Sequence, residues 1–588
     1  MVGKGVSRLA FGAPRLGVLG FGVLKLGSLG LGVVGLALAC AGGVQPLRAE
    51  EGGCSKVTAE ALGVPGLTLL GSKLQEAGEG SPRHCILSGK VNERVGVDGH
   101  TYAIQFEQRL PETWNGRFLH QVNGGNDGVV VPALGDKADG LVGGGVTPLA
   151  RGFAVLSSDS GHSGADPANK PLGLASGAAF GLDPQARRDY GYAADMTLAP
   201  IAKAIIAAHY GRKPDFSYIA GCSNGGRHTM VAADRMPQEY DGFLVGNPGF
   251  NLPRAAIQHA WDIQALSKAD PDTRKSITRD DAKLISSKII AACDALDGLK
   301  DGLTANLRAC QKTFSFDSLR CTAGATDGCL PDAKVDALKT SFAGPKNSKG
   351  EALYSDWPVD GGVGTGNWRT WKVESPIPSW NNYPIIATMG AASLDYIFST
   401  PPVAVEGSSD KLVNVLMSYD FDKDAPKVYA KQEPFSESAM DFMAPPSVDD
   451  PKLPAFQSGS RKMLIYHGQS DPVFSINDTI RWYEKLNRNV PGGAHAFARL
   501  FAIPGNTHCG GGIALEKFDA LGALMAWVET GKAPDQITAS VNKANKEIPS
   551  NWSPDRTRPL CPWPTYAKYV SGDVEAAASF ACAEPDPE

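Results

Sequence analysis

The segment IAGCSNGGRH (219–228) places a serine at the centre of a glycine-flanked turn. Gly221 and Gly225 stand two residues before and after Ser223, which is the G-x-S-x-G spacing of a nucleophile elbow. Small neighbours allow a tight strand-to-helix turn that exposes the serine hydroxyl. A hydroxyl is a weak nucleophile until a histidine takes its proton and a carboxylate orients that histidine. The spacing therefore predicts nucleophilic acyl chemistry, with an acid and a histidine to follow.

Two later loops supply those partners. Asp471 lies in YHGQSDPVF after an apolar run, and His508 lies in PGNTHC after the next apolar run. Each has an ordinary alternative, because Asp471 could be a turn residue before Pro472 and His508 a structural loop histidine. The chain order serine, acid, histidine is that of α/β-hydrolases. The order favours a catalytic triad of Ser223, Asp471 and His508.

Two other histidines lie close to these motifs. His467 ends the apolar run before the acid loop, and we expect it to form local hydrogen bonds. His228 follows the elbow by about one helical turn, and we expect it on the helix surface. Neither stands on the loop where the catalytic base belongs.

A cysteine adjoins each of two triad residues. Cys222 precedes Ser223 and Cys509 follows His508. A disulfide between them would hold the two loops together, as an exported protein permits. The alternative is a thiol nucleophile at Cys222 with His508 as its base. Because the elbow presents its central residue, which is Ser223, we predict the Cys222–Cys509 disulfide instead.

Acyl transfer also needs backbone N–H groups that stabilise the oxyanion. One is expected from Asn224, the residue after the nucleophile. The second is expected from the loop VNGGNDG (122–128), where we favour Gly125 over Gly124. A plain glycine turn is the alternative for this loop.

Bulk composition fits a large globular protein. The chain has 588 residues, which predicts two domains or one core with a large insertion. Its net charge is −5, without long runs of one sign. This charge gives no electrostatic reason to expect a nucleic-acid partner.

The N-terminus predicts export. Basic residues punctuate a leader whose last part, LGSLGLGVVGLALA (26–39), is apolar but shorter than the roughly 20 residues of a membrane span. We therefore predict a signal peptide over 1–49, no membrane span, and a secreted or periplasmic protein. Lipidation at Cys40 is the alternative, which Ala37 disfavours because a lipobox has leucine there. Without Cys40, ten of the eleven cysteines remain, enough for five disulfides.

Apolar runs and helical patterns alternate along the chain. An apolar run with a polar loop at 152–162, a helical pattern at 192–211, the elbow, a helix at 226–237 and a run at 241–249 predict a parallel α/β sheet. The pattern stops near 250 and resumes near 461. We predict an α/β fold, with an α/β-hydrolase core over 50–250 and 456–588. An inserted lid domain over 251–455 would lie above the carboxyl ends of the strands.

One motif in the insertion carries different chemistry. The segment CDALDGLKDGL (293–303) brings Asp294, Asp297 and Asp301 together with glycines that permit a tight loop. Hard oxygen ligands at this density suit calcium, although the spacing is not that of an EF-hand. On spacing alone, a solvated acidic turn fits equally well.

Together these motifs resemble the tannase and feruloyl esterase family over essentially the whole mature chain. The paired Cys–Ser and His–Cys doublets, the acid loop and CDALDGLKDGL carry the resemblance. It implies an α/β-hydrolase core, a lid, no organic cofactor and a structural Ca²⁺ site. The implied calcium ligands are the side chains of Asp294, Asp297 and Asp301 and the carbonyl oxygens of Leu299 and Leu303.

The resemblance also implies how the cysteines pair. The implied disulfides are Cys222–Cys509, Cys293–Cys310, Cys321–Cys329 and Cys561–Cys582, which leaves Cys54–Cys85 as the fifth.

Substrate contacts follow less directly from the resemblance. Phe474 matches an aromatic residue that lines the acyl pocket in the family. A lid arginine that binds a free substrate carboxylate in the family is missing, because no arginine occurs between Arg369 and Arg461. Lys372 or Lys411 could replace it, but a lysine lacks the bidentate guanidinium fork. Three lid tryptophans could either stack on an aryl group or belong to the lid core: Trp368, Trp371 and Trp380.

These features predict an exported serine esterase that cleaves small esters of aromatic carboxylic acids through an acyl-enzyme. Feruloyl, galloyl and terephthalyl acyl groups all remain open, as do the alcohol and the oligomeric state. The alternatives are a catalytically inactive binding protein and a peptidase on the same core.

Overall fold

The computed structural model describes residues 47–48, 54, 57–78, 80–135, 145–324 and 327–586. The predicted signal peptide lies outside these residues except for the short strand β1 (Leu47–Arg48), and Cys40 also lies outside them. Residues 45–588 form one compact unit. In the described part of the chain, no helix has both the length and the apolar composition that crossing a bilayer requires.

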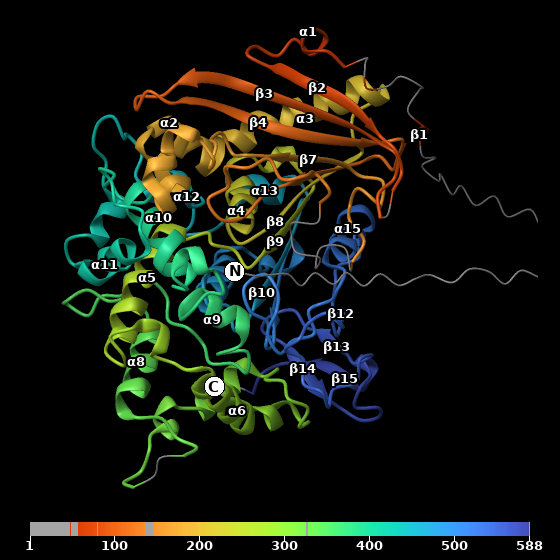
Figure 1. The fold of residues 1–588 in the computed structure, drawn as a ribbon. Helices are drawn as coiled ribbons and strands as arrows, with labels where there is room; N and C mark the ends of the chain where they lie inside the picture. The colour runs from red at the N-terminus through yellow and green to blue at the C-terminus, as the bar shows by residue number, and fades with distance from the viewer. Residues whose placement is uncertain are drawn as a thin grey trace, which may run out of the picture. The chain divides into compact units, whose positions relative to one another are not determined.

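A nine-stranded sheet in the order β11-β10-β9-β8-β6-β7-β4-β3-β2 forms the centre of this unit (Figure 1). The strands from β11 to β7 are parallel, and β4, β3 and β2 continue the sheet as antiparallel neighbours. The strands are β2 (Thr68–Gln75), β3 (His84–Val95), β4 (Thr101–Pro111), β6 (Arg117–Gln121), β7 (Ala154–Ser158), β8 (Phe216–Cys222), β9 (Gly242–Gly246), β10 (Lys462–Gly468) and β11 (Ala498–Ile503).

Helices cover both faces of the parallel strands, which are buried nearly throughout. Successive residues of a strand belong to different hydrophobic clusters. In β9, Phe243 is part of one cluster and Leu244 is part of the other. The first cluster includes side chains of α3 (Ala194–Tyr210), α4 (Asn224–Arg235) and α14 (Ile476–Asn489), and the second includes α15 (Ala520–Thr530). The α/β class is therefore confirmed. The helix predicted at 192–211 is α3, which ends where Gly211 adopts a left-handed φ of 75°.

The segment between β9 and β10 is mainly helical and packs into two further hydrophobic clusters. Its helices are α5 (Leu252–Ser267), α6 (Arg279–Cys293), α7 (Leu307–Thr313), α8 (Asp332–Phe342), α9 (Gly366–Lys372), α10 (Ala391–Tyr396), α11 (Ser409–Ser418), α12 (Ala439–Met443) and α13 (Pro454–Ser458). One of these clusters also takes in Ala175 and Phe180, which precede the elbow. The lid boundaries at 251 and 455 stay a prediction.

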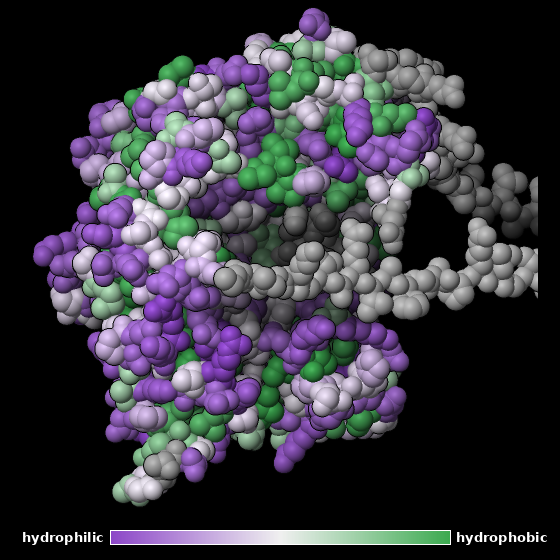
Figure 2. Space-filling view, in the orientation of Figure 1, coloured by the Kyte–Doolittle hydropathy of each residue, from purple (hydrophilic) through white to green (hydrophobic). Residues whose placement is uncertain are grey.

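Short elements complete the fold. They are α1 (Ala59–Leu62), α2 (Pro184–Arg188), β5 (Thr113–Trp114), β12 (Ile537–Ser540), β13 (Thr557–Leu560), β14 (Tyr566–Tyr569) and β15 (Phe580–Ala583). Five disulfides join the cysteine pairs that the family resemblance implies: Cys54–Cys85, Cys222–Cys509, Cys293–Cys310, Cys321–Cys329 and Cys561–Cys582. Figure 2 shows that hydrophilic side chains cover most of one face, with hydrophobic residues in small groups between them.

Candidate active site

Ser223 occupies a strained turn between β8 and α4. Its φ of 66° and ψ of −126° lie outside the regions that residues other than glycine ordinarily adopt. The turn is possible because Gly221 and Gly225, two residues before and after Ser223, lack side chains. A Cβ added to Gly221 or to Gly225 would lie 2.5 Å from the carbonyl oxygen of Val122. The glycines of the motif therefore let the preceding loop approach the elbow closely.

The structure brings Ser223, His508 and Asp471 together. Nε2 of His508 lies 2.8 Å from Oγ of Ser223, and Nδ1 of His508 lies 2.9 Å from Oδ2 of Asp471. The carboxylate accepts a hydrogen bond from Nδ1–H, so it selects the tautomer in which Nε2 is free to accept the serine proton. His508 is 6% exposed and Asp471 is 1% exposed, so this contact is largely shielded from water.

Several donors fix the carboxylate of Asp471. Oδ1 accepts hydrogen bonds from the backbone N–H groups of Val473 (2.7 Å) and Phe474 (3.1 Å), and Oδ2 accepts one from Nδ2 of Asn247 (2.8 Å). Burial alone would raise the pKa of Asp471, but the imidazoles of His508 and His467 hold that pKa below its usual range. The carboxyl group is therefore ionised, as an acid that orients a histidine must be.

The two neighbouring histidines differ from each other. His467 forms local hydrogen bonds with Oγ1 of Thr479 and the carbonyl oxygen of Phe474, both at 3.0 Å, as expected. The expectation for His228 was wrong. Its side chain is 1% exposed, because Asp127 of the loop at 122–128 and Asp195 of α3 lie against the ring. Nothing in the local sequence distinguishes this buried face from a solvated one.

The disulfide between Cys222 and Cys509 joins the elbow to the histidine loop, with 6.0 Å between the two Cα atoms. Both sulfur atoms are used in the bond, so Cys222 presents no thiol to a substrate. A covalent link one residue from Ser223 and one residue from His508 limits how far the two side chains can separate.

The loop at 122–128 lies against the elbow, where an oxyanion hole would be. A Cβ added to Gly124 would lie 3.6 Å from the carbonyl oxygen of Cys222 and 3.7 Å from Cβ of Ser223. Asn224 is the first residue of α4, so its N–H belongs to the group of helix-terminal donors that lack intrahelical acceptors. Gly125 adopts a φ of 65°. The assignment of Asn224 and Gly125 as donors stays a prediction.

Aromatic side chains flank the histidine. The ring centroids of Phe474 and Trp371 lie 5.4 Å and 5.0 Å from that of His508, each in an edge-to-face arrangement. Both side chains pack in one small hydrophobic cluster, to which Ala255 also belongs. The other two tryptophans considered above lie elsewhere: Trp368 is in a hydrophobic cluster of the segment between β9 and β10, and Trp380 is partly exposed. The neighbourhood of His508 is thus apolar and aromatic.

Neither candidate lysine presents a free ammonium group there. Lys372 is 3% exposed, and its Nζ lies 2.5 Å from Oδ2 of Asp262 and 4.5 Å from the ring centroid of Trp357. Lys411 is exposed, with Nζ 3.8 Å from a carboxylate oxygen of Glu406. The charge of Lys372 is already neutralised by a buried partner.

The acidic motif of the insertion forms a tight loop. Oδ1 of Asp294 accepts hydrogen bonds from the backbone N–H groups of Asp301 and Gly302, both at 2.9 Å. Burial, together with the charges of Asp301 and Asp294, raises the pKa of Asp297 to about 7. A cation would relieve this crowding of carboxylates, and oxygen donors suit calcium.

In the same loop, the carboxylate of Asp301 already has a cationic partner that would compete with a metal ion. Oδ2 of Asp301 lies 2.5 Å from Nη2 and 2.9 Å from Nε of Arg558. Among the residues that the structure describes, no group of three or more His, Cys, Asp or Glu side chains is arranged so that it could hold a metal ion. The donor chemistry fits calcium, while the side-chain arrangement does not form a complete ligand set.

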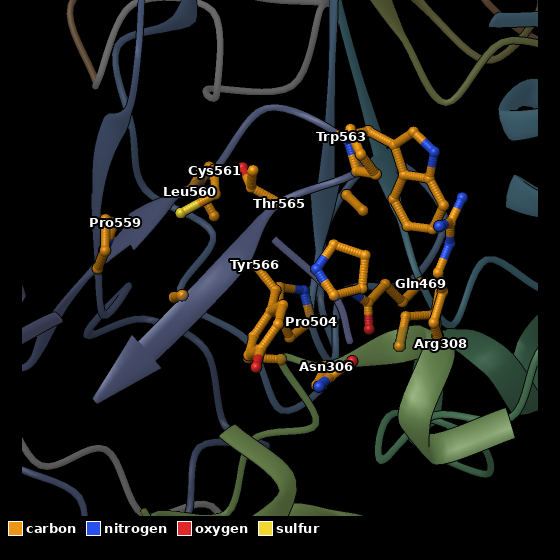
Figure 3. Close-up of a pocket in the computed structure, with 16 residues that line it drawn as sticks. Asn306, Arg308, Gln469, Pro504, Pro559, Leu560, Cys561, Trp563, Thr565 and Tyr566 are labelled. Atoms are coloured by element: carbon orange, nitrogen blue, oxygen red, sulfur yellow. The ribbon is translucent and has the colours of Figure 1, made fainter. Parts of the chain in front are cut away.

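A small cavity lies behind the acid loop and is separate from the triad. It has a volume of about 30 Å³ and is lined by Gln469, Pro504, Trp563 and Tyr566 among others. Figure 3 shows Pro504, Tyr566 and Trp563 gathered around it. Neither Ser223 nor His508 lines this cavity, and its volume holds about one water molecule. It is therefore too small to receive an ester substrate.

Comparison with known proteins gives a consistent result. The family "Tannase and feruloyl esterase" matches residues 89–583. Mono(2-hydroxyethyl) terephthalate hydrolase of Piscinibacter sakaiensis is 40% identical over 537 residues, which cover 86% of this chain and 85% of the relative. A probable feruloyl esterase of Arthroderma benhamiae is 28% identical over 81% of each chain.

Solved structures show the same fold at lower identity. Feruloyl esterase B from Aspergillus oryzae superposes with a TM-score of 0.70 at 21% identity, covering 90% of this chain and 99% of that one. Tannin acyl hydrolase from Aspergillus niger superposes with a TM-score of 0.62 at 20% identity, covering 92% and 95%.

Proposed function

The chain belongs to the tannase and feruloyl esterase family, and on that premise we propose that it is an exported serine esterase of aromatic carboxylic acids. Its relatives are esterases, so the expectation of a carboxylic ester hydrolase is confirmed. The reaction route, the acyl group and export from the cell are the parts that we propose.

The proposed route is acyl transfer through Ser223. Nε2 of His508 takes the hydroxyl proton as Oγ attacks the ester carbonyl, and the backbone N–H groups of Asn224 and Gly125 stabilise the resulting oxyanion. Asp471 orients the imidazole and stabilises its protonated form. His508 then gives the proton to the leaving alcohol. In the second half of the reaction, His508 takes a proton from water as the water attacks the acyl-enzyme, and returns it to Oγ of Ser223 as the carboxylic acid leaves. The observation that carries this proposal is the 2.8 Å contact between His508 and Ser223.

The surroundings of His508 favour an aromatic acyl group without a second charge. Phe474 and Trp371 offer ring edges and an apolar surface beside the imidazole. Lys372 is paired with Asp262 and cannot meet a substrate carboxylate without leaving that buried partner. Separating the two would leave an unpaired charge in the interior. We therefore propose a preference for neutral acyl groups such as feruloyl or galloyl.

A substrate panel tests this function. We expect methyl ferulate or methyl gallate to be hydrolysed with a kcat/KM about 10-fold or more above that for mono(2-hydroxyethyl) terephthalate, because neither Lys372 nor Lys411 offers a free ammonium group to its carboxylate. p-Nitrophenyl butyrate reports the triad without an aromatic acyl group. Faster hydrolysis of mono(2-hydroxyethyl) terephthalate than of both methyl esters would contradict the proposed preference. Hydrolysis of butyrate alone would contradict the aromatic acyl group.

Export is supported by the leader sequence and by the five disulfides, which form in oxidising compartments.

We also propose a structural Ca²⁺ ion in the acidic loop. The side chains of Asp294, Asp297 and Asp301 and the carbonyl oxygens of Leu299 and Leu303 would hold it. A divalent cation there would neutralise the crowded carboxylates and brace the loop.

Chelation tests the calcium proposal. We expect a chelator to lower the Tm of the purified protein, because an ion whose free concentration is 100 times its Kd stabilises the folded state by about 2.7 kcal/mol. Metal analysis should find calcium in the wild-type protein and less of it in Asp297→Asn. The variant Asp280→Asn, which changes an exposed carboxylate, is the control. Equal Tm values with chelator and with excess calcium would contradict the proposal.

A further inference from the structure

Asp127 connects the loop at 122–128 to the start of α4. Its side chain is fully buried, and Oδ2 accepts a hydrogen bond from Nδ2 of Asn224 at 3.0 Å. The other end of the Asn224 amide, Oδ1, accepts from Nε of Arg227 at 2.5 Å. Both segments that carry the proposed oxyanion donors are therefore tied together through one carboxylate.

His228 stands next to that carboxylate, one helical turn beyond Asn224. Nε2 of His228 lies 3.0 Å from Oδ2 of Asp127, and Nδ1 lies 2.6 Å from Oδ2 of Asp195 in α3. Both ring nitrogens thus face a carboxylate oxygen. A neutral imidazole can donate only one hydrogen bond, whereas an imidazolium donates two and satisfies both carboxylates.

The net charge around the ring favours a proton on it, against the contact with Arg227, which could donate to Nε2 of a neutral ring. Asp127 and Asp195 face it, as does Arg227, whose Nη2 lies 2.7 Å from Nε2 and donates to a backbone oxygen at 2.9 Å. His120, with Nε2 3.7 Å from Asp195, stays neutral because burial lowers its pKa to about 4. Two carboxylates and one guanidinium leave one negative charge, which an imidazolium balances.

Burial and Arg227 lower the pKa of His228, but Asp195 and Asp127 raise it more, so the net pKa lies above its ordinary value. This direction agrees with the hydrogen-bond geometry.

The same cluster also supports Gly125. The hydroxyl of Tyr190, in the turn before α3, donates to the carbonyl oxygen of Gly125 at 3.1 Å. The Tyr190 ring lies edge-on to the His228 ring, with centroids 6.2 Å apart, and the Arg227 guanidinium carbon lies 5.2 Å from the Tyr190 centroid. A shift of the His228 ring would therefore be transmitted to both donor segments.

We propose that His228, held as an imidazolium between Asp127 and Asp195, is the positioning residue that fixes the oxyanion hole of this enzyme. The inference rests on the proposed function, because it assigns a role within that reaction. His228 touches neither substrate nor reacting atoms. It acts through the carboxylate of Asp127. This carboxylate belongs to the loop at 122–128 and also accepts a hydrogen bond from Asn224.

Deprotonation of His228 has a defined consequence. At alkaline pH the ring loses one of its two donors, so either Asp127 or Asp195 loses its hydrogen bond from His228 and the cluster keeps an uncompensated negative charge. The wild-type kcat should then fall as the pH rises, at a pH above the ordinary histidine pKa of about 6.5. A glutamine at this position does not titrate, so the variant should lack this alkaline limb.

The test compares His228→Gln with wild type on the best substrate of the panel. We expect kcat to fall about 10- to 100-fold with KM changed less than about 3-fold, because the loss affects the transition state more than substrate binding. Affinity for an arylboronic acid, whose tetrahedral adduct places an oxygen in the oxyanion hole, should fall by the same factor as kcat. If the glutamine variant fails to fold, Asp127→Asn replaces it in the test. This substitution keeps the side-chain volume, and we expect it to show the same pattern.

His84→Gln is the matched control. His84 is also a buried histidine with a backbone hydrogen bond, but it lies on β3 away from the elbow. We expect its kcat and pH profile to match wild type. An unchanged kcat and an intact alkaline limb in folded His228→Gln would overturn the inference. Absence of esterase activity in the wild-type protein would instead overturn the proposed function.

Discussion

Replacement of Ser223 by alanine is expected to lower kcat by about 10⁶-fold, since this substitution removes the atom that forms the acyl-enzyme in the proposed mechanism. The fold should not change, because a methyl group fits the space of a hydroxymethyl group and the strained backbone at φ 66° is set by the surrounding glycines and β8. Steady-state kinetics on the best ester of the panel, together with Tm, measure both expectations.

Ser217→Ala is the matched control, because it makes the same change in β8, the strand that leads to Ser223, and lies outside the triad. Its activity should equal that of wild type. A Ser223→Ala enzyme that retained more than about one hundredth of wild-type kcat would show that another group attacks the ester.

Asp471→Asn is expected to lower kcat by about 10⁴-fold, with little change in the fold. The amide oxygen must replace Oδ1, because that atom accepts two backbone N–H groups. The amide NH₂ therefore replaces Oδ2 and faces Nδ1 of His508. It donates where the carboxylate accepted, which stabilises the tautomer that carries its proton on Nε2. His508 can then no longer accept the proton of Ser223.

The control for this change is Asp478→Asn, in α14. That carboxylate also accepts hydrogen bonds from an asparagine amide, that of Asn251, and does not contact the triad. We expect its kcat to match wild type. A loss of kcat in Asp478→Asn as large as in Asp471→Asn would mean that the effect comes from general disruption rather than from the tautomer of His508.

The depressed pKa of Asp471 also fixes how stability varies with pH. The group binds its proton more weakly in the folded state than in the unfolded state, so it contributes stability above the unfolded value of about pH 3.9. That contribution is lost as the pH falls below 3.9 toward the folded pKa. The asparagine variant has no such group, so acid should destabilise it less steeply than wild type.

The sequence was most informative where chemistry constrains local geometry. The G-x-S-x-G turn, the acid after one strand and the histidine after the next all lie where the predicted order placed them, because parallel strands bring their carboxyl ends to the same edge of the sheet. The doublets Cys222–Ser223 and His508–Cys509 also predicted the disulfide that joins the two loops.

Tertiary packing explains what the sequence did not reveal. His228 is buried because two helices and the loop at 122–128 close over it, and its partners Asp127 and Asp195 are distant along the chain. Lys372 directly follows Trp371 in sequence, but its partner Asp262 lies 110 residues away. No local pattern reports pairings of this kind, so the sequence could not separate a buried ion pair from a free cation.

The account depends most on Ser223 as the nucleophile. The direct measurement is mass spectrometry of the protein after a fluorophosphonate probe, with digestion to locate the labelled residue. We expect one probe per molecule, bound to the peptide that contains Ser223, and no labelling of Ser223→Ala. Labelling at another residue, or no labelling of an enzyme that still hydrolyses esters, would contradict the proposed mechanism.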